Sequence, residues 1–206
     1  MFITFEGIDG SGKSTQARLF SDWLTKKYSN KKILLTREPG GWMGGELLRE
    51  MVTDGTLKHQ WSEAYLFMLD RCEHIAKVIQ PALDLNADIV CERYHDSTLA
   101  YQVWGRGLPL EVFDTLALES KFPVPDITLF LDIPPALAAT RVAIRGNIDA
   151  FESEGIMFMS KIREGYLLLA KRSPKRWITI DVSHGTVEEI FEVIIDSILT
   201  RGYFND

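Results

Sequence analysis

Residues 2–14 read FITFEGIDGSGKS, a short apolar stretch that runs directly into a glycine-rich loop ending in Lys13 and Ser14. The loop fits the pattern G-x-x-x-x-G-K-[ST], and apolar side chains recur at helical spacing in residues 17–24. A loop of this kind between a strand and a helix binds phosphate, because its backbone N–H groups and the helix N-terminus together favour an anion. We therefore predict a phosphate cradle made of Gly7, Ile8, Asp9, Gly10, Ser11, Gly12, Lys13, Ser14 and Thr15.

The bulk composition predicts one domain and restricts its partners. At 206 residues and 46% apolar, the chain is long enough for one core, so we expect a single domain over residues 1–206. Its 23 basic and 29 acidic side chains give a net charge of −6. That charge argues against general affinity for nucleic acid or an anionic membrane surface.

The cysteines and the apolar runs suggest an intracellular protein. The two cysteines, Cys72 and Cys91, have no disulfide or zinc spacing, and we expect both to be buried reduced thiols. We see no signal peptide before the first strand and no apolar run near the ~20 residues that span a bilayer. We expect a soluble, cytoplasmic protein.

Five β-rich runs alternate with helical patterns, which predicts an α/β fold with a five-stranded parallel sheet flanked by helices. The runs are consecutively apolar, as expected of strands covered on both faces. This is the three-layer arrangement of P-loop NTPases. The predicted strands are residues 2–6, 33–37, 88–92, 127–132 and 177–181, and the predicted helices are residues 13–28, 44–53, 61–80, 96–104, 109–120, 134–145, 151–171 and 186–200.

Polar residues at the strand ends predict where ligands bind. Each strand ends in a polar residue, and open parallel sheets bind ligands beyond the carboxyl ends of their strands. Arg37 ends the second strand and Arg93 follows the third, so the two can clamp a second phosphate near the cradle. The alternative is that both arginines make ordinary surface ion pairs. The cradle alone does not separate ATPases, GTPases, motors, transport subunits and kinases.

Four further motifs resemble the thymidylate kinase family, in the right order and over nearly the whole chain. They are residues 36–41 (TREPGG), residues 69–71 (LDR) preceded by Phe67, residues 92–94 (ERY) with 97–102 (STLAYQ), and residues 141–149 (RVAIRGNID). The resemblance implies a homodimeric cytoplasmic enzyme that uses ATP and Mg²⁺ to phosphorylate dTMP to dTDP.

The resemblance also implies roles for single residues. Lys13 would reach the ATP phosphates, Ser14 would ligate Mg²⁺, and Glu92 would contact it through water. Phe67 would stack on thymine, Arg71 would donate to its O4, and Tyr101 would crowd the ribose 2′ position. The residues around the monophosphate and the base would be Asp9, Arg37, Phe67, Arg71, Arg93, Ser97, Thr98, Tyr101 and Gln102.

The predicted lid spans about residues 141–155. Positions 8–11 of the cradle contain no basic residue, and in this the chain resembles the class of the family that supplies the missing charge from the lid. The resemblance therefore implies Arg141 and Arg145 as the source of that charge, with Gly146 allowing closure. The alternative is a solvated helix end. The full catalytic set is then Asp9, Lys13, Arg93, Arg141 and Arg145, and Arg141 also contacts ATP.

Three positions depart from the family pattern. Trp42 stands where a small hydroxyl residue is usual, Glu92 where Asp is usual, and Ala150 where an arginine is common. We expect altered packing of the monophosphate loop, a shifted contact to magnesium water, and a greater burden on Arg145.

Three other functions fit the sequence less well. A kinase for another nucleotide, such as dUMP or a deoxynucleoside, would use the same cradle. A non-catalytic nucleotide-binding module has only the three departures in its favour, and Lys13, Ser14, Arg37 and Arg93 argue against it. A nucleic-acid-dependent ATPase conflicts with the net charge and with the lack of an extended basic patch.

Overall fold

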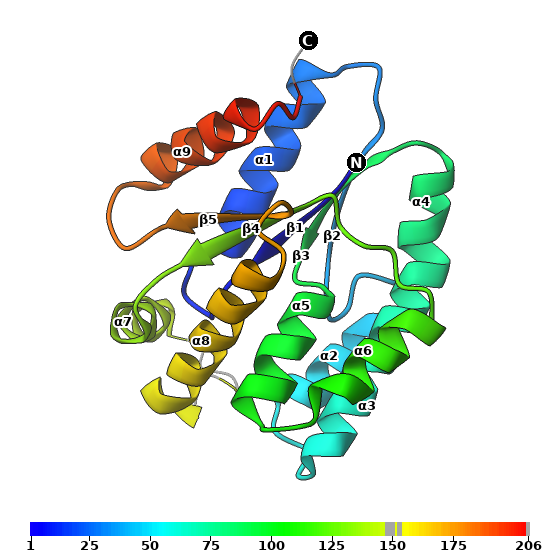
Figure 1. The fold of residues 1–206 in the computed structure, drawn as a ribbon, viewed down its shortest axis with the longest axis vertical. Coiled ribbons are helices and arrows are strands. Elements are labelled where there is room, and N and C mark those ends of the chain that lie inside the picture. The colour runs from blue at the N-terminus through cyan, green and yellow to red at the C-terminus, as the bar shows by residue number, and fades with distance from the viewer. Residues whose placement is uncertain (147–150, 152–153, 205–206) are drawn as a thin grey trace.

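A computed structural model of the chain describes residues 1–146, 151 and 154–204, without the side chain of Arg145. Within these residues, five strands form one sheet in the order β2-β3-β1-β4-β5, and every neighbouring pair is parallel (Figure 1). The predicted α/β class and strand bounds are confirmed: β1 (Phe2–Glu6), β2 (Ile33–Arg37), β3 (Asp88–Glu92), β4 (Ile127–Asp132) and β5 (Trp177–Asp181).

Helices join successive strands, as parallel strands require. Two of them widen into π-helical turns, so that α3 continues through η1 into α4, and α5 continues into η2. The helical elements are α1 (Lys13–Lys27), α2 (Gly45–Thr53), α3 (Gln60–His74), η1 (Ile75–Ile79), α4 (Gln80–Asp84), α5 (His95–Thr98), η2 (Leu99–Gly105), α6 (Leu110–Glu119), α7 (Pro135–Arg145), α8 (Ile156–Arg172) and α9 (Val187–Thr200).

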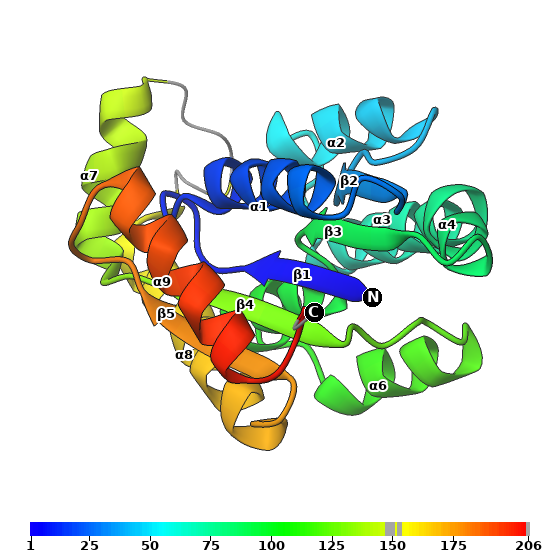
Figure 2. The same ribbon diagram turned by 90° about the horizontal axis from the view of Figure 1, so that it is seen from above.

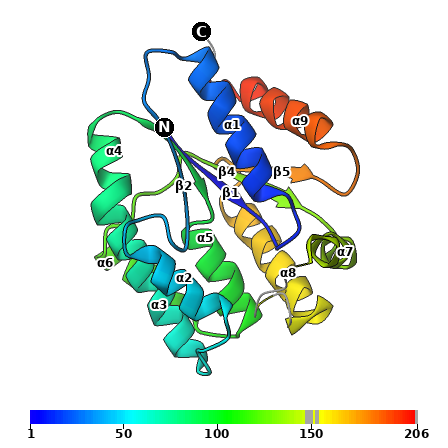
Figure 3. The ribbon, with the colours of Figure 1, turned by 180° about the vertical axis from the view of Figure 1, so that it is seen from behind.

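The three central strands, β1, β3 and β4, are buried on both faces, which explains why they are consecutively apolar, whereas the edge strand β2 is partly exposed. Phe5 of β1 packs on Phe20 of α1 with ring centroids 5.8 Å apart, whereas Phe2 points the other way and packs on Tyr94 at 5.0 Å. Seen from behind, α1 and α9 lie in front of the sheet and α8 lies beyond it (Figure 3). Alternate residues of a central strand therefore enter two separate packing layers.

Two expectations about the helices and cysteines are wrong. The helix expected over residues 151–171 begins at Ile156, because Gly155, with φ 85°, stands at its N-cap in a conformation that L side chains rarely adopt. Cys91 is buried as expected, but Cys72 is exposed on α3. Helical spacing explains this difference, since neighbouring Arg71 is the residue that turns into the protein.

The carboxyl ends of the strands meet along one edge of the sheet (Figure 2). Arg37 at the end of β2 pairs in register with Glu92 at the end of β3, and Glu92 pairs with Phe5 next to the cradle. No helix among the described residues is both long enough and apolar enough to cross a membrane.

Candidate active site

The cradle connects β1 to α1 and depends on its glycines. Gly10 and Gly12 have φ of 84° and 87°, a region that L side chains rarely adopt. A Cβ on Gly10 would also lie 2.5 Å from the carbonyl oxygen of Ala138. Ile8 and Ser11 are buried beneath the loop, so its backbone and the side chains of Lys13 and Ser14 face the ligand space.

Lys13 is an ammonium held in the floor of the site. It is 4% exposed, its Nζ donates to the Ile8 carbonyl at 2.9 Å, and it lies 3.9 Å from Asp9 Oδ1. Burial, followed by the nearby charge of Arg93, lowers the pKa of Lys13 to about 8. A second anion, such as a phosphate, would therefore stabilise its charged form.

Asp9, Arg93 and Tyr101 form a compact cluster beside Lys13. The Arg93 guanidinium donates to one oxygen of Asp9, and the Tyr101 hydroxyl donates to the other at 2.8 Å. Burial alone would raise the pKa of Asp9, but the charges of Arg93 and Lys13 hold it well below its ordinary range. Arg93 also donates to the Gly7 carbonyl and to Ser97, so it is fixed before a ligand arrives.

Ser14 and Glu92 present adjacent oxygen atoms, which suits a hard cation. The Ser14 hydroxyl donates to Glu92 Oε1 at 2.7 Å. Hydroxyl and carboxylate oxygens are the ligands that Mg²⁺ takes, and Mg²⁺ completes its shell with water and substrate phosphates. Among the described residues, no group of three or more His, Cys, Asp or Glu side chains could hold a metal ion.

Arg37 differs from Arg93 in its environment. It lines the same cavity, yet its side chain is 44% exposed and pairs with Glu46 of α2 at 2.6 Å. Arg93 is 15% exposed and pairs inside the site. The surface ion pair considered for Arg37 is therefore present, whereas Arg93 has the buried position.

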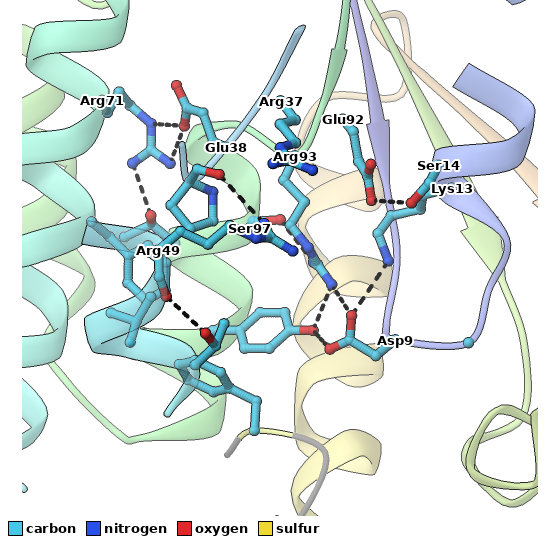
Figure 4. Close-up of a pocket in the computed structure, with 18 of the residues that line it drawn as sticks. Asp9, Lys13, Ser14, Arg37, Glu38, Arg49, Arg71, Glu92, Arg93 and Ser97 are labelled. Atoms are coloured by element: carbon cyan, nitrogen blue, oxygen red, sulfur yellow. Dashed lines mark hydrogen bonds and ion pairs between the residues drawn. The ribbon is translucent and has the colours of Figure 1, made fainter. Parts of the chain in front are cut away.

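The predicted base-binding residues gather at the far end of the cavity. Phe67 lines it from α3, and Arg71, one turn later, is 2% exposed and donates to Thr98 at 2.8 Å. The Gln102 amide donates to Glu63 at 2.8 Å. Figure 4 places Arg71 and Lys13 at opposite ends of this set, with Arg93 and Asp9 nearer Lys13.

The strand ends contribute less than expected. Among the five predicted polar ends, Arg37 and Glu92 line the cavity. Glu6 is fully buried and accepts bonds from Tyr94, Ser97 and Tyr166. Burial, with the charge of Asp96, raises the pKa of Glu6 to about 7.

Trp42 explains how the loop after β2 packs. Its indole Nε1 donates to Asp70 at 2.9 Å, and the ammonium of Lys77 lies 4.2 Å from its ring centroid. A Cβ on Gly44 would lie 2.4 Å from this ring. The tryptophan thus fastens the loop to α3 and η1, a packing that a small hydroxyl residue would not provide.

The predicted lid is only partly described. Arg141 lines the cavity and donates to the Val182 carbonyl at 2.9 Å, and Phe151 packs on Phe67 and Tyr101. Gly146, with φ 86°, ends α7. The side chain of Arg145 and the whole of Ala150 lie outside the described residues.

Sequence reasoning missed several residues at this site, among them Glu38, Arg49 and His74. Glu38 and Arg49 line the cavity, and His74 bonds to Glu38. Glu38 lies next to Arg37 in the TREPGG motif. Its hydrogen-bond partner, Arg71, is 33 positions away, so no local sequence pattern indicates its role. For Arg49, the available sequence signal was an arginine within the helix predicted over residues 44–53.

The whole cavity has a volume of about 850 Å³ and joins an anion cradle to a buried guanidinium. Such a space accepts an elongated ligand that carries phosphate at one end and a hydrogen-bond acceptor at the other. Its predicted lining residues are Asp9, Gly10, Gly12, Lys13, Ser14, Thr15, Arg37, Phe67, Arg71, Glu92, Arg93, Ser97, Thr98, Tyr101, Gln102 and Arg141.

Known proteins of one family match the chain over nearly its full length. Residues 5–194 match the family model described as thymidylate kinase. The thymidylate kinase of Kosmotoga olearia is 41% identical over 201 residues, which cover 97% of this chain and 95% of that one. The enzyme of Onion yellows phytoplasma is 39% identical, with 94% of each chain covered. The crystal structure of thymidylate kinase from Ehrlichia chaffeensis superposes with a TM-score of 0.81 at 32% identity, over 97% of this chain and 98% of that one.

Proposed function

The chain belongs to the thymidylate kinase family, which transfers the γ-phosphoryl group of ATP to dTMP, and on this premise we propose how its cavity performs the reaction. The observation that carries the proposal is the pairing of a phosphate cradle with a buried guanidinium in one cavity of about 850 Å³. ATP phosphates occupy the cradle, and dTMP lies across Arg93 with its base toward Arg71.

The reaction needs positioning and charge rather than a covalent intermediate. An oxygen of the dTMP phosphate attacks the γ-phosphorus in line, the new P–O bond forms as the bond to the β-phosphate oxygen breaks, and ADP leaves. Lys13 and Arg93 neutralise charge on the transferring group, and Asp9 holds Arg93 in place. Ser14 and Glu92 would hold Mg²⁺, which would supply positive charge that offsets the negative charge of the phosphates.

The base end selects by hydrogen-bond chemistry. Arg71 carries donors only, so it satisfies the O4 acceptor of thymine or uracil, whereas cytosine presents an amino donor there. An unpaired buried donor costs about 1–3 kcal/mol, while the thymine methyl contributes only ~0.8 kcal/mol of burial. We expect dUMP to be a poorer substrate than dTMP, and dCMP to be nearly inactive.

A coupled assay with ATP, Mg²⁺ and a panel of dTMP, dUMP and dCMP tests this proposal. Lys13→Ala should fold normally and lose roughly 10²-fold or more in kcat/KM. Arg71→Ala should raise KM for dTMP and reduce the dTMP-over-dCMP ratio. Near-native turnover in a folded Lys13→Ala enzyme would remove the cradle assignment.

We further propose that residues 1–206 act as one kinase domain and that residues 141–155 close over ATP as a lid. Arg141 supports this proposal, because it lines the cavity from the last turns of α7. Because the reaction consumes ATP, we place the enzyme in the cytoplasm, which cell fractionation tests.

We also propose a homodimer that pairs through α3 and α6. Trp61 of α3 stacks on Phe113 of α6 with centroids 6.1 Å apart, so the start of α3 contacts α6. Tyr65 and Leu69 of α3 and Leu118 of α6 are 62%, 51% and 75% exposed, and exposed apolar side chains favour association. Sedimentation of wild type and Leu69→Lys would test it, since a monomeric wild type contradicts the proposal.

A further inference from the structure

Arg71 is held by a buried chain of hydrogen bonds that begins on β2. Its Nε and Nη2 lie 2.8 and 2.7 Å from Glu38 Oε2, and both side chains are 2% exposed. The other oxygen of Glu38 lies 2.9 Å from His74 Nδ1, and His74 Nε2 lies 2.7 Å from the Thr36 hydroxyl. Figure 4 shows Glu38 and Arg71 joined in this way at the base end of the cavity.

The bonds of this chain are mutually consistent. With its proton on Nδ1, the His74 ring donates to Glu38 while the Thr36 hydroxyl donates to Nε2, so each group uses its natural donor or acceptor. His74 is fully buried, and a Cβ on Gly41 would lie 2.6 Å from both His74 Nε2 and Thr36 Oγ1. The loop therefore leaves room for this contact only with glycine at position 41.

The secondary structure places these residues together. Thr36 lies in β2 and Glu38 directly follows it, while Arg71 and His74 stand three residues apart on α3. Residues at that spacing share one helix face. Arg71 and His74 therefore both bond to Glu38, and His74 also bonds to Thr36. Thr98 also accepts a hydrogen bond from Nη1, so the guanidinium is bonded to Glu38 and to Thr98.

We infer that Glu38 and His74 are positioning residues that fix the Arg71 guanidinium and thereby set the discrimination between thymine and cytosine. An arginine has many rotamers, and holding it in one of them before binding removes that entropy cost from recognition. A loosened guanidinium can turn away from an amino donor, which relaxes the rejection of cytosine. This inference rests on the proposed role of Arg71 in reading the base.

Two amide variants of His74 separate positioning from packing. In His74→Asn the side-chain amide can occupy the place of Nδ1 and still donate to Glu38, whereas in His74→Gln it reaches the place of Nε2 and retains only Thr36. We expect His74→Gln to lower the dTMP-over-dCMP ratio of kcat/KM by roughly tenfold. His74→Asn should stay within about twofold of wild type, and saturating kcat for dTMP should change little in either.

A purely structural role predicts the opposite order, because Asn leaves the larger void at this buried position. Asp70→Asn is the matched control. Asp70 lies on the same helix and accepts bonds from Gly40 and Trp42, so its loss disturbs the loop without removing a bond to Arg71. We expect Asp70→Asn to keep the wild-type dTMP-over-dCMP ratio of kcat/KM. The melting temperatures of all variants report whether they fold.

The outcomes distinguish the inference from the proposal beneath it. If Arg71→Ala kept the wild-type dTMP-over-dCMP ratio of kcat/KM, Arg71 itself would not read the base. A shifted ratio in Arg71→Ala with wild-type ratios in His74→Gln and in the isosteric Glu38→Gln would overturn the positioning role alone. A greater loss in His74→Asn than in His74→Gln, or an equal loss in Asp70→Asn, would also overturn it.

Discussion

Replacing Lys13 by methionine should stabilise the ligand-free enzyme while it removes activity. The Lys13 ammonium is 4% exposed, and its pKa falls from 10.5 to about 8. The folded state therefore disfavours the positive charge that would bind the ATP phosphates. Methionine has a similar length and no charge to desolvate. Functional sites are expected to be locally unfavourable in this way, because the ligand supplies the missing partner.

The size of the effect follows from the pKa of Lys13. The lowering of this pKa from 10.5 to about 8 corresponds to about 3 kcal/mol that opposes folding at pH 7. Methionine also loses the bond to the Ile8 carbonyl, which offsets about 1–2 kcal/mol, while the attraction to Asp9 is already contained in the lowered pKa. The expected net gain is about 1–2 kcal/mol, or roughly 2–8 °C in Tm for a chain of this size.

The pH dependence has a definite sign. Since the pKa of Lys13 is depressed in the folded state, the unfolded chain binds more protons between about pH 8 and 10.5, and wild-type stability gains from Lys13 as the pH rises. The advantage of Lys13→Met should therefore shrink by about 1 kcal/mol between pH 7 and pH 9.

Calorimetry of both proteins without nucleotide, at pH 7 and pH 9, measures this difference directly. Saturating ATP should reverse the order at pH 7, because it stabilises only the protein that binds it. A stability difference that stayed constant or widened from pH 7 to pH 9 would refute the reasoning.

Three further predictions concern the phosphate end and the lid. Arg93→Ala should lower kcat/KM for dTMP more than Arg37→Ala, because Arg93 is buried against Asp9 whereas Arg37 is paired on the surface; equal losses in parallel steady-state assays would contradict this. Glu92→Gln should raise the Mg²⁺ concentration for half-maximal activity roughly tenfold, since an amide is a weaker ligand than a carboxylate, and an unchanged Mg²⁺ titration would place Glu92 away from the cation. Arg145→Ala should lower kcat by on the order of 10² with little change in dTMP affinity, because a lid arginine acts on charge that develops in the transition state. Calorimetry and single-turnover kinetics test this last prediction, and a collapse of affinity with unchanged chemistry would reverse it.

The strands and the cradle could be predicted from the sequence because their signals are local. A buried strand is a run of apolar residues, and the cradle is eight consecutive positions followed by a helix. The base end was predictable only through the family resemblance. Phe67 and Arg71 alone read as one face of an amphipathic helix.

The supporting contacts could not be predicted, because they join distant parts of the chain. Glu38 and Arg71 are 33 positions apart, and nothing near either residue indicates that both are buried together. Contacts between distant parts of the chain also explain why the position of Glu6 could not be predicted. It ends a strand like the other polar residues, but the bonds it accepts from Tyr94 and Tyr166 keep it out of the cavity.

The strand register brings opposite charges to neighbouring positions at the edge of the sheet. Arg37 and Glu92 are register neighbours on β2 and β3, and the Arg37 side chain pairs with Glu46 of α2. Glu92 is also bonded to Ser14, which leaves its second oxygen able to serve a cation.

Inside the cavity the arginines at the two ends differ in how they share a carboxylate. At the cradle, Lys13 and Arg93 both contact Asp9, and Glu92 bonds to Ser14 nearby. At the far end, Arg71 pairs with one oxygen of Glu38, whose other oxygen bonds to His74, and Arg71 also lines the cavity. On the proposed binding mode, the two cations around Asp9 would attract anionic phosphate, and the far end would accept an uncharged base, because burial there makes an unpaired donor or acceptor costly. The same side-chain type would thus bind charge at one end and hydrogen-bond the base at the other, because Arg93 shares its carboxylate with a second cation, Lys13, whereas Arg71 pairs with a carboxylate whose other oxygen is bonded to His74.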